Sequence, residues 1–259
     1  MDLNLSNKVF IVTGGAKGIG AAISKTIAEE GGIAVVVGRG KADNIKITDE
    51  IIKSGGKASY VTAELGTPAA CREVIDFTSE KYGRIDGLVN NAGINDGVGL
   101  EKGSPEKFFE SLHKNLSHYY NLAHYALPFL KQSKGNIVNI GSKVAVTGQG
   151  NTSGYAASKG AINALTREWA VELLPYSIRV NTVLPAEVWT PLYENWINSL
   201  PNPKEKLEQI VAKIPFEKRM TTAEEIADMT VFLLSSRSSH TTGQILFVDG
   251  GYTHLDRSL

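Results

Sequence analysis

The sequence predicts one doubly wound α/β domain, built on a seven-stranded parallel sheet with helices on both faces. Seven short runs rich in apolar and β-branched residues alternate with longer segments in which apolar residues recur at helical spacing. Such βαβ repetition is typical of a parallel sheet. The runs are apolar on both faces, as expected for strands that helices cover on both sides. We expect strands at residues 9–12, 33–37, 58–61, 85–89, 137–140, 178–183 and 245–248.

The segments between these strands supply the helices in chain order. After the first strand, Ile19, Ile23, Ile27 and Ala28 form one apolar stripe of a helix. We expect further helices over residues 104–131 and 155–174. The segments 104–131 and 153–174 could form subunit interfaces or pack within one chain. Residues 185–218 are irregular and rich in proline, and we expect them to form an insert that caps a substrate site. No linker or low-complexity stretch divides the chain, so residues 1–259 are predicted to be a single domain.

The composition excludes several classes of protein. The chain of 259 residues has 27 basic and 27 acidic side chains, a balance that argues against a nucleic-acid partner. Its apolar runs are far shorter than the roughly 18 residues that a membrane-spanning helix needs. Residues 1–8 are polar and lack the features of a secretory signal, so a cytoplasmic location is expected. The single cysteine, Cys71, cannot form an internal disulfide and is interpreted as a packing residue in a reducing compartment.

A glycine-rich loop follows the first strand directly and opens the first helix. Its pattern over residues 13–20, T-G-x-x-x-G-x-G, contains Gly14, Gly18 and Gly20. Glycines allow the backbone to turn tightly and to approach a pyrophosphate, and a helix N-terminus offers unpaired N–H groups and a positive dipole end. The pattern therefore predicts a dinucleotide site. The alternative is a plain glycine turn between a strand and a helix.

The residue at the end of the second strand indicates which dinucleotide binds. An acidic residue there would accept hydrogen bonds from the ribose hydroxyls and repel a 2′-phosphate, but this chain has Arg39. A guanidinium can pair with a phosphate, and Lys17 in the loop could add a second charge. We therefore favour NADP over NAD. If Arg39 is instead a solvated loop residue, both cofactors could serve.

A second group of residues carries the features of proton-transfer chemistry. Tyr155 and Lys159 lie four residues apart and share one helix face, so the lysine charge could stabilise a tyrosine phenolate. Such a pair alone is a weak signal, since most are surface pairs. However, Ser142 lies at the end of the fifth strand, where a parallel sheet presents residues to its ligand crevice. The sequence Asn90-Asn91-Ala92-Gly93 ends the fourth strand, and Asn115 lies in the helical pattern that follows.

These motifs, in this order and spacing, resemble the short-chain dehydrogenase/reductase family over essentially the whole chain. The resemblance implies a Rossmann fold and a homotetramer, and it implies no metal. By that resemblance Tyr155 is the catalytic acid/base, Lys159 lowers its pKa and holds the nicotinamide ribose, Ser142 steadies the reacting oxygen, and Asn115 anchors a water that relays protons. The predicted cofactor contacts are Gly14, Lys17, Gly18, Ile19, Gly20, Arg39, Glu64, Leu65, Asn91, Ala92, Gly93, Tyr155, Lys159, Pro185, Val188 and Thr190.

The chain departs from the usual family pattern at two places. The family usually has Pro-Gly after the sixth strand, whereas this chain has Pro185 and Ala186 followed by Glu187. The carboxylate of Glu187 is therefore expected beside the nicotinamide site. Glu64 stands where the family more often has Asp in contact with the adenine. Neither departure removes the catalytic set.

Polar residues near these motifs favour a polyhydroxylated substrate over an acyl chain, because unpaired polar groups disfavour apolar ligands. Residues 143–154 and the insert are expected to line the pocket. Asp96, Thr152 and Tyr193 contribute polar groups there, and the predicted substrate contacts are Asn95, Gln149, Asn151, Glu187 and Trp196. The alternative for Gln149 and Asn151 is that both are solvent-exposed turn residues.

Four local strings, N-N-A-G-I-N-D-G, T-G-Q-G-N-T-S-G-Y, P-A-E-V-W-T-P-L-Y and V-D-G-G-Y-T-H-L-D-R, resemble a narrower group of bacterial dehydrogenases that act on L-fucose and related sugars. This resemblance implies oxidation of the anomeric C1 hydroxyl to a lactone, with hydride passing to NADP. Our hypothesis is that Glu187 and Asn151 bind sugar hydroxyls. His254 could reach a neighbouring subunit's pocket, but a buried structural role is favoured. A reductase for a ketone or 3-oxoacyl thioester and a non-enzymatic NADP-binding sensor are the alternative functions.

Overall fold

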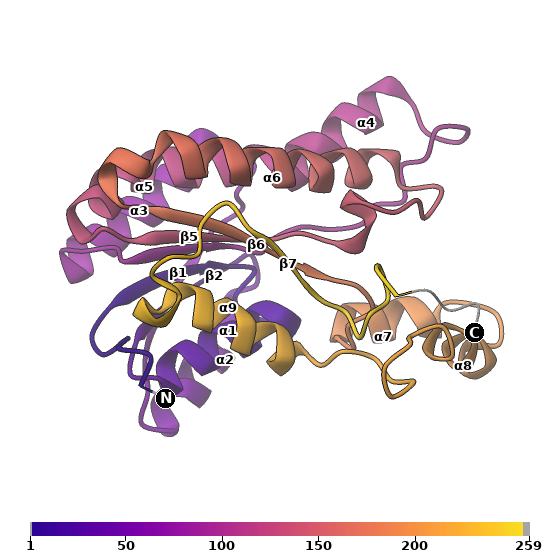
Figure 1. Ribbon diagram of the computed structural model, residues 1–259, viewed down its shortest axis with the longest axis horizontal. Coiled ribbons are helices and arrows are strands. Elements are labelled where there is room, and N and C mark those ends of the chain that lie inside the picture. The colour runs from indigo at the N-terminus through magenta and orange to yellow at the C-terminus, as the bar shows by residue number, and fades with distance from the viewer. Residues whose placement is uncertain (1, 256–259) are drawn as a thin grey trace.

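The computed structural model describes residues 2–255, and its core is a seven-stranded parallel sheet. The strand order is β3-β2-β1-β4-β5-β6-β7, and every neighbouring pair is parallel (Figure 1). This confirms the predicted fold class. The strands are β1 (Val9–Thr13), β2 (Ile33–Gly38), β3 (Lys57–Thr62), β4 (Gly87–Asn90), β5 (Asn136–Ile140), β6 (Arg179–Pro185) and β7 (Ile245–Val248).

Helices cover both faces of the sheet, as the two-sided apolar strands predict (Figure 1). One face carries α3 (Pro68–Tyr82), α5 (His118–Ser133) and α6 (Ser153–Glu172). The opposite face carries α1 (Gly18–Glu29), α2 (Lys41–Lys53) and α9 (Ala223–Leu234). All residues of β1 and β5 are buried between these layers, and each fully buried leucine, isoleucine or phenylalanine side chain stabilises the fold by about 1.5–3 kcal/mol.

The sheet topology creates one crevice at the carboxyl ends of the central strands. The chain runs outward from β1 through β2 to β3, and then returns to the other side of β1 with β4. Connections on either side of β1 therefore leave in opposite directions, and a ligand crevice is expected at that point. The loops after β1, β4, β5 and β6 leave the sheet at this edge. They carry the polar residues that are predicted to act on cofactor or substrate.

Two segments differ in detail from the helices that the sequence predicts. The pattern over residues 104–131 is divided into α4 (Pro105–Leu112), a π-helical turn (His113–Ser117) and α5. The insert at residues 185–218 contains α7 (Pro191–Asn198) and α8 (Pro203–Val211). Helix α7 begins there because Pro191 supplies a preset φ, and the hydroxyl of Thr190 accepts a hydrogen bond from the Tyr193 N–H at 3.2 Å.

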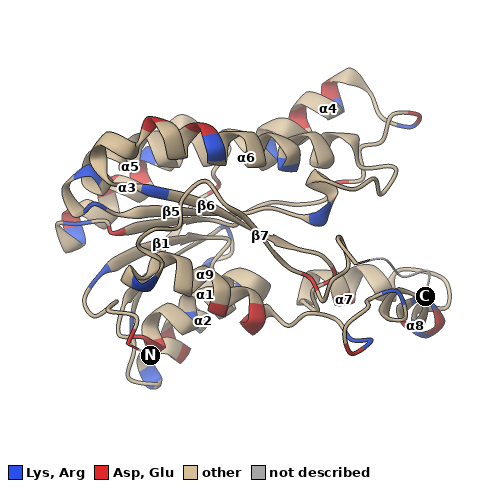
Figure 2. Cartoon of the chain, viewed as in Figure 1, with Lys and Arg blue, Asp and Glu red and all other residues tan. Residues whose placement is uncertain are grey.

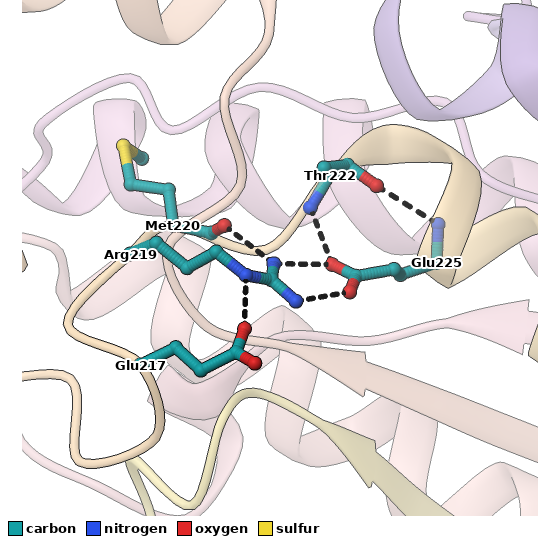
Figure 3. Close-up of polar contacts among 5 residues, drawn as sticks. All are labelled: Glu217, Arg219, Met220, Thr222 and Glu225. Atoms are coloured by element: carbon teal, nitrogen blue, oxygen red, sulfur yellow. Dashed lines mark hydrogen bonds and ion pairs between the residues drawn. The ribbon is translucent and has the colours of Figure 1, made fainter.

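Charged side chains are distributed over the helices and loops, with both signs interspersed (Figure 2). A compact group at the start of α9 consists of Glu217, Arg219 and Glu225, which we call the Arg219 cluster (Figure 3). The Arg219 guanidinium donates to the Glu217 carboxylate at 2.7 Å and to both oxygens of Glu225 at 2.6 and 3.0 Å. Glu225 and Thr222 also form a reciprocal capping box, which satisfies two backbone N–H groups of α9.

Two smaller expectations are decided by burial. Cys71 is fully buried, and burial raises the pKa of its thiol to about 11, which confirms a packing role. His254 is exposed and its ring packs 4.2 Å from that of Phe247, so the expectation of a buried histidine is wrong.

Asp256 and Arg257, the last residues of the C-terminal string, lie outside the described residues. Within residues 2–255, no helix combines the length and the hydropathy required to span a bilayer.

Candidate active site

The glycine-rich loop between β1 and α1 is shaped for close approach of a phosphate group. Gly14 and Gly18 have φ angles of +60° and +51°, a backbone region that favours glycine. A Cβ atom at Gly20 would lie 2.1 Å from the Gly14 carbonyl oxygen, so only glycine fits there. Within residues 2–255, no side chain caps the N-terminus of α1, and the first turn contains no acidic residue. The N–H groups of this turn are thus available to an anion.

The loop after β4 is fixed to the glycine-rich loop by Thr13. The Thr13 hydroxyl accepts hydrogen bonds from the N–H groups of Asn91 and Ala92 at 2.8 and 3.0 Å. The Asn91 side chain in turn donates to the Thr13 carbonyl at 2.8 Å. A Cβ atom at Gly14 would approach the Asn91 amide nitrogen to 2.9 Å, which indicates how tightly the two loops pack. The structure therefore brings two predicted cofactor segments together, with Thr13 as the residue that the sequence reasoning did not single out.

The start of the insert completes this side of the crevice. A Cβ atom at Gly18 would lie 3.2 Å from the Thr190 side chain, so the loop after β6 reaches the glycine-rich loop. Val188 is buried and forms a bridge with Thr221, which holds this loop against the start of α9. Pro185 ends β6, opposite Val248 of β7. Of the predicted cofactor residues of this loop, Thr190 thus lies beside Gly18, and Ile19 next to it is partly buried.

Two exposed ion pairs flank the end of β2. The Arg39 guanidinium lies 3.4 Å from the Glu64 carboxylate, and both side chains are exposed. The Lys17 ammonium lies 2.8 Å from the Asp43 carboxylate. Leu65, next to Glu64, is buried and offers an apolar surface. Both cations are held loosely at the surface, where a phosphate could replace the carboxylates as a partner.

Ser142 and Tyr155 meet at the carboxyl end of β5. Ser142 follows that strand, and Tyr155 lies in the first turn of α6. Burial raises the pKa of Tyr155 to about 12, and a hydrogen bond with the Ser142 hydroxyl lowers it in part. Desolvation of the phenol dominates the pKa of Tyr155 in this structure, and the lowering by Lys159 stays a prediction.

Lys159 is buried and oriented toward the sheet. Its ammonium donates to the Ile140 carbonyl at 2.8 Å and to the Tyr119 hydroxyl at 3.2 Å, and it lies 5.5 Å from the centre of the Tyr155 ring. Burial lowers the pKa of Lys159 to about 7, which weakens its charge at neutral pH. Tyr119, which the sequence reasoning missed, also donates to the Ile140 carbonyl at 3.0 Å.

Asn115 lies in the π-helical turn, fully buried and close to Lys159. Its side-chain oxygen accepts a hydrogen bond from the Ile94 N–H at 2.7 Å, and its amide donates to the Ser111 carbonyl at 3.0 Å. A Cβ atom at Gly93 would lie 3.1 Å from the Asn115 side-chain oxygen and 3.8 Å from the Lys159 ammonium. The predicted neighbours Gly93, Asn115 and Lys159 therefore do form one group. The Asn115 side chain is occupied in fixing the loop after β4.

A largely buried ion pair involves Lys143, the residue after Ser142 in the chain. The Lys143 ammonium contacts the Glu187 carboxylate, and the two side chains are 12% and 13% exposed. The same ammonium lies 4.2 Å from the centre of the Tyr252 ring, a cation–π distance. Burial and the Glu187 charge both raise the pKa of the nearby Tyr193 phenol. We call Lys143, Glu187, Tyr193 and Tyr252 the polar wall.

The sequence reasoning found Glu187 and Tyr193 but missed Lys143 and Tyr252. These residues follow β5 and β7, so their position after a strand of a parallel sheet was the available signal. The other predicted substrate contacts lie farther out on the surface. Asn95, Gln149 and Asn151 are exposed, and Trp196 is 45% exposed while its ring packs 5.1 Å from that of Tyr193. Asn151 adopts a φ of +56° and lies against Gly99, so the loops of residues 95–103 and 148–152 touch at the rim.

Comparisons with known proteins agree with this geometry. The profile of a family described as enoyl-(acyl carrier protein) reductase matches residues 14–253. A 3-oxoacyl-(acyl-carrier-protein) reductase of Thermotoga maritima is 35% identical over 254 residues, covering 96% of this chain and 99% of that protein. An L-fucose dehydrogenase of Bos taurus is 35% identical over 252 residues, covering 97% of this chain and 91% of that protein. The crystal structure of Cj0485 dehydrogenase is 46% identical with a TM-score of 0.94, covering 100% of this chain and 99% of that one.

The matches extend over nearly the whole chain and include the glycine-rich loop, the strand-end residues and the insert. The matched proteins are dehydrogenases and reductases. The family predicted from the sequence is thereby confirmed. The chain belongs to the short-chain dehydrogenase/reductase family and is an NAD(P)-dependent oxidoreductase.

Proposed function

We propose that this protein oxidises the C1 hydroxyl of L-fucose or a related aldose to the lactone, with NADP as the hydride acceptor. The observation that carries the choice of substrate is the polar wall beside Ser142 and Tyr155. Its ion pair is largely withdrawn from water, and an acyl chain against it would leave charged groups without polar partners. A sugar would supply hydroxyls there. The likeness to an L-fucose dehydrogenase supports the same choice.

The proton chemistry is assigned to residues at the end of β5. Tyr155 takes the proton of the C1 hydroxyl, and Ser142 orients that oxygen through its own hydroxyl. Lys159 supplies positive charge on the far side of the phenol and holds the nicotinamide ribose. Asn115 fixes the loop after β4 and anchors a water beside Lys159. The nicotinamide, when bound, accepts the hydride, so the protein provides orientation and proton transfer.

The cofactor is assigned to the crevice formed by the glycine-rich loop, the loop after β4 and the loop after β6. The uncapped first turn of α1 and the glycine positions that exclude a Cβ fit a pyrophosphate. Glu64 and Leu65 would contact the adenine. Arg39 favours NADP, with Lys17 as a second cation that could exchange Asp43 for the 2′-phosphate.

Residues at the rim complete the proposal. Asn95, Gln149, Asn151 and Trp196 are proposed to contact the parts of the sugar farthest from the reacting carbon. Exposed apolar side chains on α4 to α6, among them Phe109, Tyr120 and Val171, are consistent with subunit contacts in a homotetramer. A cytoplasmic location accords with such a cofactor and with a single buried thiol.

The second candidate is a 3-oxoacyl thioester or ketone reductase, which would use the same residues in the opposite direction. The reductase relative and the description of the matched family favour it. A sensor that binds NADP without turnover is the third candidate, although Ser142, Tyr155 and Lys159 are all in place.

The test is nicotinamide absorbance with purified protein, NADP or NAD, and L-fucose, related aldoses or simple secondary alcohols. We expect reduction of NADP with L-fucose or a close relative, and a loss of about 10²- to 10⁴-fold in Tyr155→Phe. Oxidation of NADPH by oxoacyl thioesters, with no turnover of any aldose, would replace the proposal by the reductase. Saturable NADP binding without any turnover would favour the sensor. Light scattering measures the oligomeric state in the same samples.

A further inference from the structure

The polar wall combines groups from the carboxyl ends of three adjacent strands. Lys143 follows β5, Glu187 follows β6 and Tyr252 follows β7, and these strands are neighbours in the sheet. Lys143 is the residue next to Ser142, so their Cα atoms are about 3.8 Å apart. One member of the ion pair is therefore the immediate chain neighbour of Ser142, the proposed partner of the reacting oxygen. Tyr193 reaches it from the first turn of α7.

Each element that carries the polar wall is fixed by backbone contacts of its own. The Lys143 carbonyl accepts hydrogen bonds from the N–H and the hydroxyl of Thr147, both at 3.0 Å. The Glu187 carbonyl accepts from the Thr221 N–H at 3.0 Å. Tyr252 donates its N–H to the Asp249 carbonyl at 3.1 Å, in a turn that the Asp249 carboxylate also caps. The backbone that carries each of these three side chains is thus fixed.

Stability alone does not explain a charge pair at this position. A largely buried ion pair gains little over apolar side chains of similar volume, because both charges lose their hydration. Burial and the adjacent Glu187 carboxylate raise the pKa of the Tyr193 phenol, so a further buried polar group converges on the same carboxylate. A polar ligand against the polar wall would meet several hydrogen-bonding groups there. The geometry therefore points to recognition.

The charges of the polar wall also select the chemistry of that ligand. Glu187 neutralises Lys143, so an anionic group would meet repulsion from the carboxylate as well as attraction from the ammonium. A neutral group that both donates and accepts avoids this conflict. The Lys143 ammonium has three donors, and the Glu187 carboxylate accepts only. Two neighbouring hydroxyls match such a donor and acceptor side by side.

We propose that the Lys143–Glu187 pair recognises two neighbouring hydroxyls of the substrate, those on C2 and C3, next to the C1 carbon that is oxidised. Lys143 donates to one hydroxyl oxygen, Glu187 accepts from the next hydroxyl, and Tyr193 contributes a further polar contact. Tyr252 holds the ammonium in place through its ring. This inference rests on the proposed aldose oxidation and makes Lys143 a specificity-determining residue.

The experiment compares L-fucose with 2-deoxy-L-fucose, which lacks the hydroxyl next to C1. For the wild type, we expect kcat/KM to be about 10- to 100-fold higher for L-fucose, the worth of one hydrogen bond to a charged group. This ratio should fall to within about threefold of unity in whichever of Lys143→Met and Glu187→Gln removes the partner of the C2 hydroxyl, with the loss confined mainly to KM for L-fucose. The matched controls are Lys25→Met and Glu50→Gln, which alter an exposed ion pair on α1 and α2. Their ratio should equal that of the wild type.

Folding and cofactor binding are monitored separately, by thermal unfolding and by quenching of tryptophan fluorescence with NADP. If a variant does not fold, Lys143→Arg and Glu187→Asp replace it, and they should retain part of the discrimination. Equal losses on both sugars, or an unchanged ratio, would overturn the inference while leaving aldose oxidation in place. A wild type without activity on any aldose would instead refute the proposed function, and the inference with it.

Discussion

Two groups of charges, the Lys143–Glu187 pair and the Arg219 cluster, contain the same chemistry in different surroundings. In the polar wall, Lys143 and Glu187 are 12% and 13% exposed and come from loops after neighbouring strands. In the Arg219 cluster, Arg219, Glu217 and Glu225 are 44%, 52% and 38% exposed and lie within nine residues of one another. Arginine hydrogen bonding lowers the pKa of Glu225 to about 2.

The difference shows that burial, more than the number of contacts, decides what a charge pair does. The Arg219 cluster has more hydrogen bonds, yet water screens each of its charges and would hydrate any partner left alone. Its role is local, since it supports the capping box of α9 (Figure 3). In the polar wall, neither partner can be removed without leaving the other charge poorly hydrated.

The largest effect on the free energy of unfolding is expected for His118, a buried side chain that carries no charge at neutral pH. Burial, followed by the nearby Lys159 charge, lowers the pKa of His118 to about 4, against about 6.5 in an unfolded chain. Between these values the unfolded state binds a proton that the folded state does not, so stability is complete above pH 6.5 and falls toward pH 4. Over this pH range the free energy of unfolding should fall by about 3 kcal/mol. Urea denaturation across this range measures it.

The variant His118→Gln should lose most of this pH dependence, because glutamine does not titrate. His254→Gln, at the exposed histidine, is the matched control and should keep the wild-type curve. A pH dependence that persists in His118→Gln would show that other groups cause it.

The second largest effect on the free energy of unfolding is expected for a substitution in the polar wall. Glu187→Ala leaves the Lys143 ammonium without its carboxylate partner, and we expect a loss of about 2–3 kcal/mol in the free energy of unfolding. The KM for the sugar should rise far more than the KM for NADP, because Glu187 is proposed to bind a sugar hydroxyl. Urea denaturation and steady-state kinetics measure the two effects. Equal increases in both KM values would contradict the substrate role of Glu187.

A smaller effect is expected when both charges are removed together. Lys143→Met combined with Glu187→Leu replaces the ion pair by apolar side chains, and stability should return to within about 1 kcal/mol of the wild type. Activity on aldoses should stay low. A double variant less stable than Glu187→Ala would mean that the pair stabilises the fold by itself, and the comparison with the Arg219 cluster would fail.

The smallest effect is expected for Arg219→Ala. Because all three side chains of the Arg219 cluster are exposed, Tm should change by no more than about 2 °C and activity should be unchanged. Differential scanning calorimetry with parallel kinetics tests this. A decrease in Tm as large as that of Glu187→Ala would remove the distinction between the two groups.

Much of the fold and half of the site follow from local sequence patterns. The strands were predictable because their apolar runs are continuous, and the glycine-rich loop because its spacing stands between a strand and a helix. Ser142, Glu187 and Thr190 could be placed at one edge of the sheet, since the carboxyl ends of parallel strands share that edge. Side-chain partners could not be predicted in the same way. The break in the helical pattern at Asn115 was also missed, because the π-helical turn is a single turn of i→i+5 hydrogen bonds inside an otherwise continuous helical segment.

The sequence by itself determined the class of fold, the family and the positions of Tyr155 and Lys159, because these depend on periodicity and on spacing along the chain. The tertiary structure decided the partners and the electrostatics. Lys143 meets Glu187 across 44 residues, and Lys159 is directed to Tyr119 and the Ile140 carbonyl. Burial, which raises the pKa of Tyr155 and lowers that of Lys159, is a property of the packed molecule. It depends on which distant elements exclude water from each group, and spacing along the chain does not encode that.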